Sequence, residues 1–207
     1  MHDFFQQAVS GFFQQSIIEL TAVALAVAYL VLAMRQNIWC WACAFVSTAL
    51  FTWVFFDVSL VMESLLNVYY MAMAVYGYRS WTQGKDNGRQ LSIRFWTPAY
   101  HVYALSLVAV LTLMSGYFLS QKTEAAWPYL DSFTTWGAVV TTYMVARKIF
   151  ENWIYWFVIN SVALFLYIER GLYPTALLMM IYLVLVIIGI ISWSRQLEPV
   201  LSEEAPI

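Results

Sequence analysis

The sequence predicts an all-α integral membrane protein with seven transmembrane helices. Of its 207 residues, 62% are hydrophobic and only 11% are charged, whereas a soluble domain has about 25% charged residues. The apolar residues fall in runs long enough to cross ~30 Å of hydrocarbon as helices. These runs, for example Leu177 to Ile191, lack the polar–apolar alternation of membrane β-strands. Helices are therefore the expected spanning elements.

Seven apolar stretches give the expected spans. They cover about residues 17–34, 38–56, 58–78, 98–120, 130–147, 152–168 and 172–194. The main polar stretch, Arg79 to Arg94, predicts a solvated loop. Residues 1–16 contain no Lys or Arg, so they do not look like a signal peptide. Their periodic aromatic and glutamine residues predict an amphipathic helix at the membrane surface.

The basic residues indicate the orientation of the chain. If the N-terminus lies outside, eight of the ten Lys and Arg residues fall in inner loops, and only Lys122 and Arg170 lie outside. Because inner loops of membrane proteins are enriched in Lys and Arg, we expect the N-terminus outside and the C-terminus in the cytoplasm. An odd number of spans agrees with this placement.

The sequence matches itself when it is shifted by 112 residues. Over the 47 positions from Arg35 to Trp81, 11 residues are identical at this shift. The informative matches are those of less common residues, namely Arg35 with Arg147, Trp41 with Trp153, Gly77 with Gly189 and Trp81 with Trp193. Spans 1–3 and 5–7 are therefore predicted to be two copies of one three-helix unit.

This repeat predicts a 3+1+3 organisation. The expected parts are an amphipathic N-terminal segment 1–16, a first repeat 17–81, a cytoplasmic loop with a linker helix 82–129, a second repeat 130–194 and a cytoplasmic tail 195–207. Because the linker helix adds one crossing, the two copies run parallel. Parallel repeats occur in transporters, with the substrate site near the midplane between the halves. Gene duplication also builds membrane proteins that do not transport.

A substrate is not symmetric, so we expect its site where the two copies differ. Trp153, Trp156 and Asn160 are spaced i, i+3 and i+7 on one helical face. The two indoles can stack on a flat cationic ring, and Asn160 can hydrogen-bond its polar edge. The alternatives are an interfacial tryptophan at position 153 and an interhelical hydrogen bond from Asn160 beside packed indole. The equivalent residues of the first copy are Trp41, Ala44 and Thr48.

The third span carries a second polar face. Glu63, Asn67 and Tyr70 are spaced i, i+4 and i+7. A carboxylate inside a span is a hypothesis for a functional site, because burying its charge is costly. Glu63 could attract a cation near the outer mouth, or it could pair with another span for structural reasons. The equivalent residues of the second copy are Thr175, Met179 and Tyr182. Because the site is expected between the copies, Tyr182 and the first-copy residues Trp41 and Thr48 are also candidate binding residues.

Other membrane proteins are less compatible with the sequence. A retinal protein needs a lysine in its last span, but all three lysines lie in expected loops. His2 and His101 are isolated in the sequence, and no metalloprotease, serine-hydrolase or P-loop motif is present. We therefore expect no enzymatic activity, metal or cofactor. A non-transporting scaffold subunit and, more remotely, an intramembrane enzyme stay alternatives.

The two cysteines, Cys40 and Cys43, form a CxxC pair. A redox or zinc site would need a βαβ context or a second pair of ligands, and neither is visible in the sequence. We therefore interpret the pair as two small residues that pack in a helix.

Three motifs resemble the Pnu-type vitamin transporter family, over essentially the whole chain. They are RKxxENWxxWxxxN at 147–160, GLY at 171–173 and YGxxxW at 76–81. The family has a nicotinamide riboside branch, PnuC, and a thiamine branch, PnuT. The resemblance implies a homotrimer in a bacterial inner membrane, with one pathway per protomer. It also implies facilitated diffusion of a cationic B-vitamin, followed by trapping when a cytosolic kinase phosphorylates the vitamin.

The resemblance also implies which residues bind the vitamin. Trp153, Trp156 and Asn160 match the substrate-binding positions of the family. Asn67 stands where riboside transporters often have Gln, and this shorter side chain favours the thiamine branch. The compact length and the residues Met62-Glu63-Ser64 are also similar to short thiamine-branch members. Thiamine is therefore the expected substrate, with nicotinamide riboside as the alternative.

Overall fold

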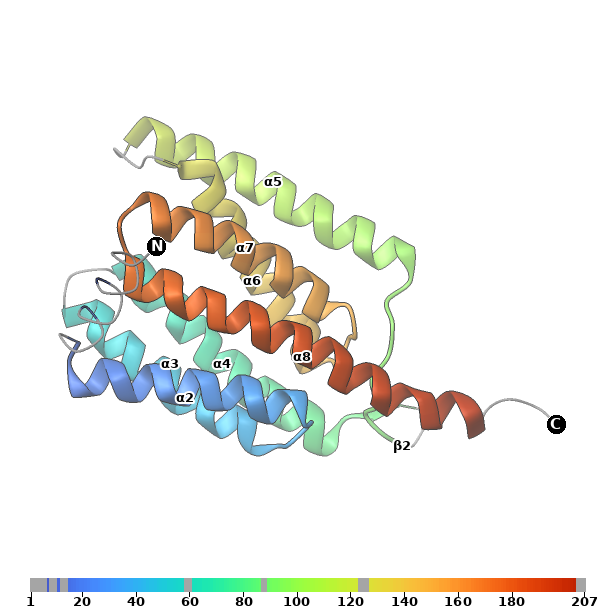
Figure 1. The fold of residues 1–207 in the computed structure, drawn as a ribbon. Helices are drawn as coiled ribbons and strands as arrows, with labels where there is room; N and C mark the ends of the chain where they lie inside the picture. Colours follow the sequence, from blue (N-terminus) through green and yellow to red (C-terminus); the bar gives the residue numbers. More distant parts are fainter. Residues whose placement is uncertain are drawn as a thin grey trace. The chain divides into compact units, whose positions relative to one another are not determined.

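The computed structural model describes residues 7, 11, 15–57, 61–86, 89–122 and 127–203. Within these ranges the chain forms seven long helices and one small β-hairpin (Figure 1). The helices are α2 (Ile17–Met34), α3 (Trp39–Asp57), α4 (Val61–Gln83), α5 (Pro98–Lys122), α6 (Pro128–Ala146), α7 (Asn152–Glu169) and α8 (Tyr173–Glu203). The hairpin pairs β1 (Lys85–Asp86) with β2 (Arg89–Gln90). The expected all-helical class is confirmed, and each expected span coincides with a helix. The predicted amphipathic helix 1–16 lies outside the described residues, apart from positions 7, 11, 15 and 16.

The seven helices differ in polarity. Four of them, α2, α3, α5 and α8, are long and apolar enough to cross a membrane by length and composition. The other three, α4, α6 and α7, have 23, 19 and 18 residues. Even 18 residues span roughly 27 Å at 1.5 Å per residue, so these helices differ from the first four in composition rather than length. Two of the three, α4 and α7, carry most of the predicted site residues.

Local sequence explains where several helices begin and end. At the start of α2, the Ser16 hydroxyl accepts a hydrogen bond from the backbone N–H of Glu19 at 3.2 Å. The Glu19 carboxylate accepts one from the Ser16 N–H at 2.7 Å, which completes a capping box. Helix α7 ends before Gly171, whose φ of +69° is a left-handed conformation that glycine adopts without strain.

The ends of α2 and α6 have the same backbone turn. Gln36 and Lys148, which are 112 residues apart, have φ values of 51° and 52°. The following amides make equivalent bonds, from Asn37 N to the Leu32 carbonyl and from Ile149 N to the Met144 carbonyl, both at 2.9 Å. Non-glycine residues with positive φ are uncommon, so the recurrence of this turn at the repeat distance is a specific likeness.

The chain divides into two compact units. Among the described residues, unit 1 comprises 7, 11, 95–122, 127–142 and 151–186, and unit 2 comprises 15–57, 61–86, 89–94, 143–150 and 187–203. Unit 1 therefore contains α5 and α7 with most of α6 and the first part of α8. Unit 2 contains α2, α3 and α4, together with the ends of α6 and α8.

In unit 2, helix α3 lies against both α2 and α4 (Figure 1). Small polar side chains join these helices. The buried Ser47 hydroxyl of α3 donates to the Ala22 carbonyl of α2 at 2.7 Å. The Ser64 hydroxyl of α4 donates to the Thr52 carbonyl of α3 at 3.0 Å. Small side chains let helix backbones approach closely, and hydroxyl bonds to carbonyls join helices in an apolar medium.

Tryptophans make up much of the rest of the unit 2 core. Trp41 packs so closely on Gly77 that a Cβ at this glycine would overlap the indole ring. The rings of Trp41 and Trp81 meet edge to face, with centroids 5.4 Å apart. Helix α4 continues to Gln83, beyond the expected end at residue 78. The predicted loop Arg79 to Arg94 is thus partly wrong, because it contains the last turn of α4, where Trp81 is buried, and the hairpin.

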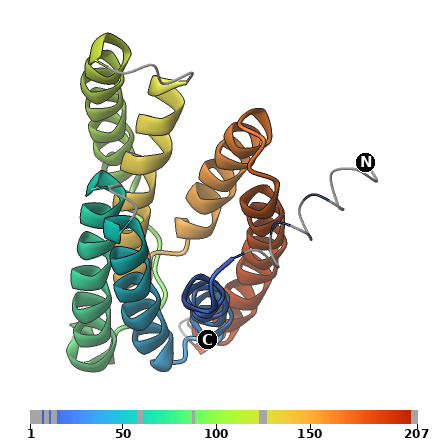
Figure 2. The ribbon, with the colours of Figure 1, turned by 90° about the vertical axis from the view of Figure 1, so that its left-hand side faces the viewer.

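In unit 1, helix α6 contacts both α5 and α7. Figure 2 shows α5 and α6 side by side where the chain turns from one to the other. The Trp136 indole N–H of α6 donates to the Ser115 hydroxyl of α5 at 3.0 Å. Gly137 of α6 leaves room for the Ile159 side chain of α7, which a Cβ would meet at 3.1 Å. An ion pair joins Arg170, after α7, to Asp131 of α6.

Candidate substrate-binding site

The nine predicted binding residues are divided between the two units. Five belong to unit 2, namely Trp41, Thr48, Glu63, Asn67 and Tyr70. Four belong to unit 1, namely Trp153, Trp156, Asn160 and Tyr182. The structure therefore places one group on α3 and α4 and the other on α7 and α8, and each group has its own geometry.

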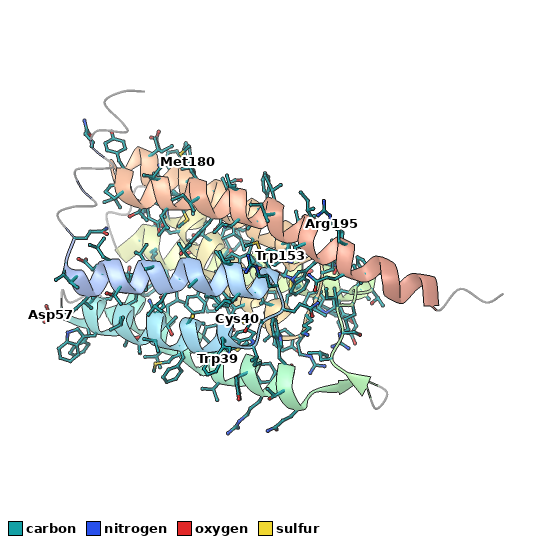
Figure 3. All side chains as sticks on the ribbon, turned by 60° about the horizontal axis from the view of Figure 1, so that its bottom comes forward. Trp39, Cys40, Asp57, Trp153, Met180 and Arg195 are labelled. Carbon is teal, nitrogen blue, oxygen red and sulfur yellow. The ribbon has the colours of Figure 1, made fainter. Side chains whose placement is uncertain are left out.

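The α7 group is set into the protein. Trp153, in the first turn of α7, is only 1% exposed, so protein rather than lipid surrounds it (Figure 3). Trp156 is half-buried one turn later. Asn160 is 6% exposed and lies ~12 Å along the helix from its first residue. The burial of Trp153 is unlike that of an interfacial tryptophan, which faces the headgroup region.

Asn160 has the chemistry of a ligand-binding residue. Its amide makes no hydrogen bond with another residue in the part of the chain that the structure describes. A buried amide costs free energy unless a partner satisfies its donor and acceptor groups. Both groups of Asn160 are therefore available to a polar ligand that reaches this face of α7.

The α4 group starts at the end of its helix. Glu63 lies in the first turn of α4, and its side chain is exposed. Asn67 is 9% exposed, and its amide nitrogen donates to the Glu63 backbone carbonyl at 2.9 Å. This bond orients the amide so that its oxygen is the group left to accept a bond from a ligand. Tyr70 is half-buried, with its ring 5.6 Å from that of Tyr69.

Of the remaining three residues, Thr48 and Trp41 make contacts with their own helix or with neighbouring core residues. The Thr48 hydroxyl donates to the Ala44 carbonyl of its own helix at 2.8 Å, a common arrangement for threonine in a helix. Trp41 is 2% exposed and packs on Gly77 and Trp81. Tyr182 is half-buried on α8.

Sequence reasoning missed a cluster in unit 1 formed by Trp96, His101, Glu151 and Tyr155, which we call the histidine cluster. His101 is isolated in the sequence, but the fold gives it two side-chain partners. Its Nδ1 lies 2.9 Å from the Tyr155 hydroxyl, and its Nε2 lies 3.2 Å from Glu151. The Glu151 carboxylate also accepts the backbone N–H of Trp96 at 3.2 Å. The cluster ties the start of α5 to the start of α7, the helix that carries Trp156 and Asn160.

A second unexpected cluster lies in unit 2 and consists of Gln36, Trp81, Lys148 and Gln196, which we call the lysine cluster. The Lys148 ammonium donates to the Gln36 side-chain carbonyl at 2.7 Å and lies 4.7 Å from the centre of the Trp81 ring. The Gln36 amide donates to Gln196. Burial lowers the pKa of Lys148 from its ordinary value. No carboxylate pairs with Lys148 among the described residues.

Metal-binding groups are sparse. Among the described residues, no three His, Cys, Asp or Glu side chains lie together as a metal site requires. Cys40 and Cys43 are free thiols, and Cys40 is buried. Their position near the start of α3 agrees with the interpretation of two packed residues (Figure 3).

Two curated proteins are similar to the chain over most of its length. It is 28% identical over 203 residues to the riboflavin/roseoflavin transporter RibM of Streptomyces davaonensis, which covers 94% of both chains. It is 25% identical over 194 residues to the nicotinamide riboside transporter PnuC of Escherichia coli, which covers 81% of both. Neither of these two names refers to thiamine.

A solved structure has a similar fold. The crystal structure of a vitamin B3 transporter PnuC matches with a TM-score of 0.73 and 20% sequence identity, over 95% of this chain and 88% of that one. The family model for nicotinamide mononucleotide transporters matches residues 16–195, which leaves out residues 1–15 and the end of the chain from residue 196. The chain therefore belongs to the nicotinamide mononucleotide transporter family.

Proposed function

We propose that the protein carries a flat, nitrogen-heteroaromatic vitamin across a membrane by facilitated diffusion, and that thiamine is the first candidate substrate. The observation that carries the proposal is the α7 face, where Trp156 and the unsatisfied amide of Asn160 follow the buried Trp153. Membership of a transporter family supports the same activity. RibM and PnuC are named for riboflavin and nicotinamide riboside, which are also flat heterocycles with hydroxyl groups.

Each binding residue has a role in this proposal. Trp156 stacks on the ring, aided by cation–π attraction when the ring is charged. Asn160 bonds the polar edge of the ring, and Asn67 accepts a hydrogen bond through its amide oxygen. Tyr70 and Tyr182 occupy equivalent positions of the two copies and line the path, while Glu63 attracts the cation. Trp153, which is buried in the first turn of the same helix, anchors α7 one turn before Trp156.

Two predicted residues receive packing roles instead. Trp41 is enclosed by Gly77 and Trp81, and the Thr48 hydroxyl bonds its own helix. We therefore leave both outside the substrate-binding set.

The choice of vitamin rests on Asn67. Its side chain is one methylene shorter than the Gln of riboside transporters, so it leaves more room beside α4. The amino group of the thiamine pyrimidine is a donor that suits the Asn67 oxygen. Nicotinamide riboside is the second candidate, because its carboxamide is also a donor and the relative PnuC is named for it.

The proposed architecture has seven spans arranged as two parallel three-helix copies joined by α5. The matching turns at Gln36 and Lys148 support the repeat. The more polar helices α4, α6 and α7 suit positions along a polar path, where side chains that lipid would disfavour are tolerated. We place the N-terminus outside and the C-terminus in the cytoplasm of a bacterial inner membrane.

The proposed cellular context follows from the family resemblance. The protein acts as a homotrimer with one path per protomer. A cytosolic kinase phosphorylates the vitamin, and the charged ester no longer returns through the carrier. Net uptake then needs no ion gradient, since the kinase keeps the internal concentration of free vitamin low.

Uptake into liposomes tests the proposal. Purified protein should give saturable uptake and counterflow of labelled thiamine that a proton ionophore leaves unchanged. Competition with nicotinamide riboside and riboflavin ranks the substrates. Tight nicotinamide riboside binding without thiamine binding would overturn the choice of thiamine. Absence of saturable uptake for all three vitamins would contradict the transport function itself.

A further inference from the structure

Unit 2 contains two hydrogen bonds between the copies, and each bond joins positions equivalent to those of the other, with the two copies interchanged. The Trp81 indole N–H donates to the Val145 carbonyl at 3.3 Å. The Trp193 indole N–H donates to the Ala33 carbonyl at 3.1 Å. Trp193 follows Trp81 by 112 residues, and Val145 follows Ala33 by the same interval. A contact from i to j that is matched by its exchanged counterpart is the signature of a two-fold relation.

A third contact joins one pair of equivalent positions directly. Lys148 follows Gln36 by 112 residues, and its ammonium donates to the Gln36 side-chain carbonyl at 2.7 Å. Both residues have the same left-handed backbone. Equivalent positions of a two-fold arrangement touch each other only where the axis passes between them. The local pseudo-two-fold axis therefore passes through the Lys148–Gln36 contact.

The position of this axis has a consequence for transport. In transporters built from parallel repeats, the axis follows the membrane normal and the substrate site lies between the copies. We propose that Lys148 and Gln36 form a constriction on the substrate path, and that the Lys148 ammonium makes this constriction sensitive to the charge of the vitamin. The inference rests on the proposed transport function. It adds where the vitamin leaves the substrate path and which residue determines specificity there.

The surroundings of the contact suit a side-chain gate on a fixed backbone. The Arg94 N–H donates to the Lys148 carbonyl at 3.1 Å, and the Phe150 N–H donates to the Arg94 carbonyl at 2.8 Å. Both bonds join the loop after α6 to the backbone of Arg94. On the α8 side, the Gln196 amide donates to the Ser192 carbonyl at 2.9 Å. The Lys148 and Gln36 side chains can therefore separate by rotamer changes while the backbone stays in place.

The charge of the constriction comes from only one copy. Lys148 has an ammonium where the first copy has the neutral Gln36, and no described carboxylate offsets it. An ammonium without a counterion raises the local potential, which opposes a cation more than a neutral molecule of the same shape. The Lys148 ammonium therefore repels a cationic vitamin as it passes this end of the path. A neutral analogue passes without this repulsion.

Cross-linking tests the constriction. The parent is a variant with Cys40→Ala and Cys43→Ala, to which Gln36→Cys and Lys148→Cys are added. A short bis-methanethiosulfonate linker joins the two new thiols. We expect cross-linked protein to bind labelled thiamine with affinity within about twofold of the parent but to lose more than about tenfold of its uptake rate. Reduction of the linker should restore uptake.

A matched pair of cysteines serves as the control. Asp131→Cys and Arg170→Cys, at the ion pair in unit 1, lie within one copy and should tolerate the same linker without loss of uptake. If the Gln36–Lys148 cross-link leaves uptake unchanged while the parent transports, the constriction is disproved. If the parent takes up no vitamin, the proposed function fails instead, so the two failures are distinguishable.

A single substitution tests the role of charge. Lys148→Gln gives both copies a neutral glutamine at the axis. Thiamine uptake should rise several-fold, whereas uptake of a neutral isostere, with thiophene in place of thiazolium, should change much less. An equal change for both compounds would disprove the charge effect. Equal thermal unfolding midpoints for variant and parent would show that the difference is not one of folding.

Discussion

Helices α3 and α7 occupy equivalent places in the two copies but are used differently. Both have a buried tryptophan in the first turn, with Trp41 at 2% exposed and Trp153 at 1%. After Trp41 the face continues with the small Ala44 and with Thr48, whose hydroxyl bonds its own backbone. After Trp153 it continues with Trp156 and Asn160, which offer a large aromatic surface and an unsatisfied amide. Helix α3 thus has a packing role, whereas its counterpart α7 has the binding role in the proposed site.

The comparison teaches where specificity can change after a duplication. The tryptophan that holds the helix in the core is kept in both copies, because its loss would leave a large cavity. The residues one and two turns later are less constrained by ligand binding in α3, which is assigned only a packing role, than in α7. Substitutions that interchange the two helices therefore separate packing from binding.

The largest effect is expected from Gly77→Ala, on the packing side of the comparison. The new Cβ would overlap the Trp41 ring, and overpacking of this kind costs about 1–3 kcal/mol. The thermal unfolding midpoint in detergent should fall, with little change in vitamin affinity of the folded fraction. Gly137→Ala is the control, since its Cβ would lie 3.1 Å from two side-chain atoms of Ile159, whereas a Cβ at Gly77 would lie 2.3 Å from the Trp41 ring. Equal midpoints for the two variants would contradict the tight Trp41–Gly77 packing.

Trp156→Ala should have the next largest effect, on binding rather than on stability. Loss of ring stacking and of cation–π attraction should weaken thiamine affinity by ~1–2 kcal/mol. Tryptophan fluorescence quenching or calorimetric titration measures this change. Trp53→Ala, at an exposed position of α3, is the control and should bind normally. Unchanged affinity in Trp156→Ala would remove this residue from the site.

The helices could be predicted from the sequence because each depends on local composition and length. Contacts between distant residues could not. Helix α4 ends five residues later than expected because Trp81 bonds the Val145 carbonyl, which lies 64 residues away. His101 has partners 50 and 54 residues away, and no spacing rule connects them.

In the candidate site, too, local features could be predicted from the sequence and contacts between distant residues could not. Helical spacing predicts that Trp156 and Asn160 share a face of α7, and α7 is a helix as expected. The burial of Trp153 and the packing of Trp41 depend on tertiary neighbours, so spacing alone treats the two as equal. The contact of Gln36 with Lys148 could not be predicted from the repeat for another reason. A search for identities at the 112-residue shift passes over a position where glutamine faces lysine.

Asn160→Leu should have a smaller effect than Trp156→Ala. The change removes a hydrogen bond to the vitamin, worth about 0.5–1.5 kcal/mol, while the apolar leucine avoids an unsatisfied group in the core. Competition binding with thiamine measures the loss. Thr48→Val is the matched change at the equivalent position of the first copy and should leave affinity unaltered. Similar losses of affinity in both variants would show that α3 also binds the vitamin.

The smallest effect is expected from Glu63→Gln. The Glu63 side chain is exposed, so its attraction for a cation is screened by salt and acts mainly on the association rate. Thiamine association should slow by roughly twofold to threefold at low salt and should match the parent at high salt. Glu169→Gln, another exposed acid, is the control and should show no such slowing. A large loss of affinity that persists at high salt would instead indicate direct contact between Glu63 and the vitamin. Helix α4 would then supply a binding carboxylate beside Asn67, and α3 would be the helix of the first copy that only packs.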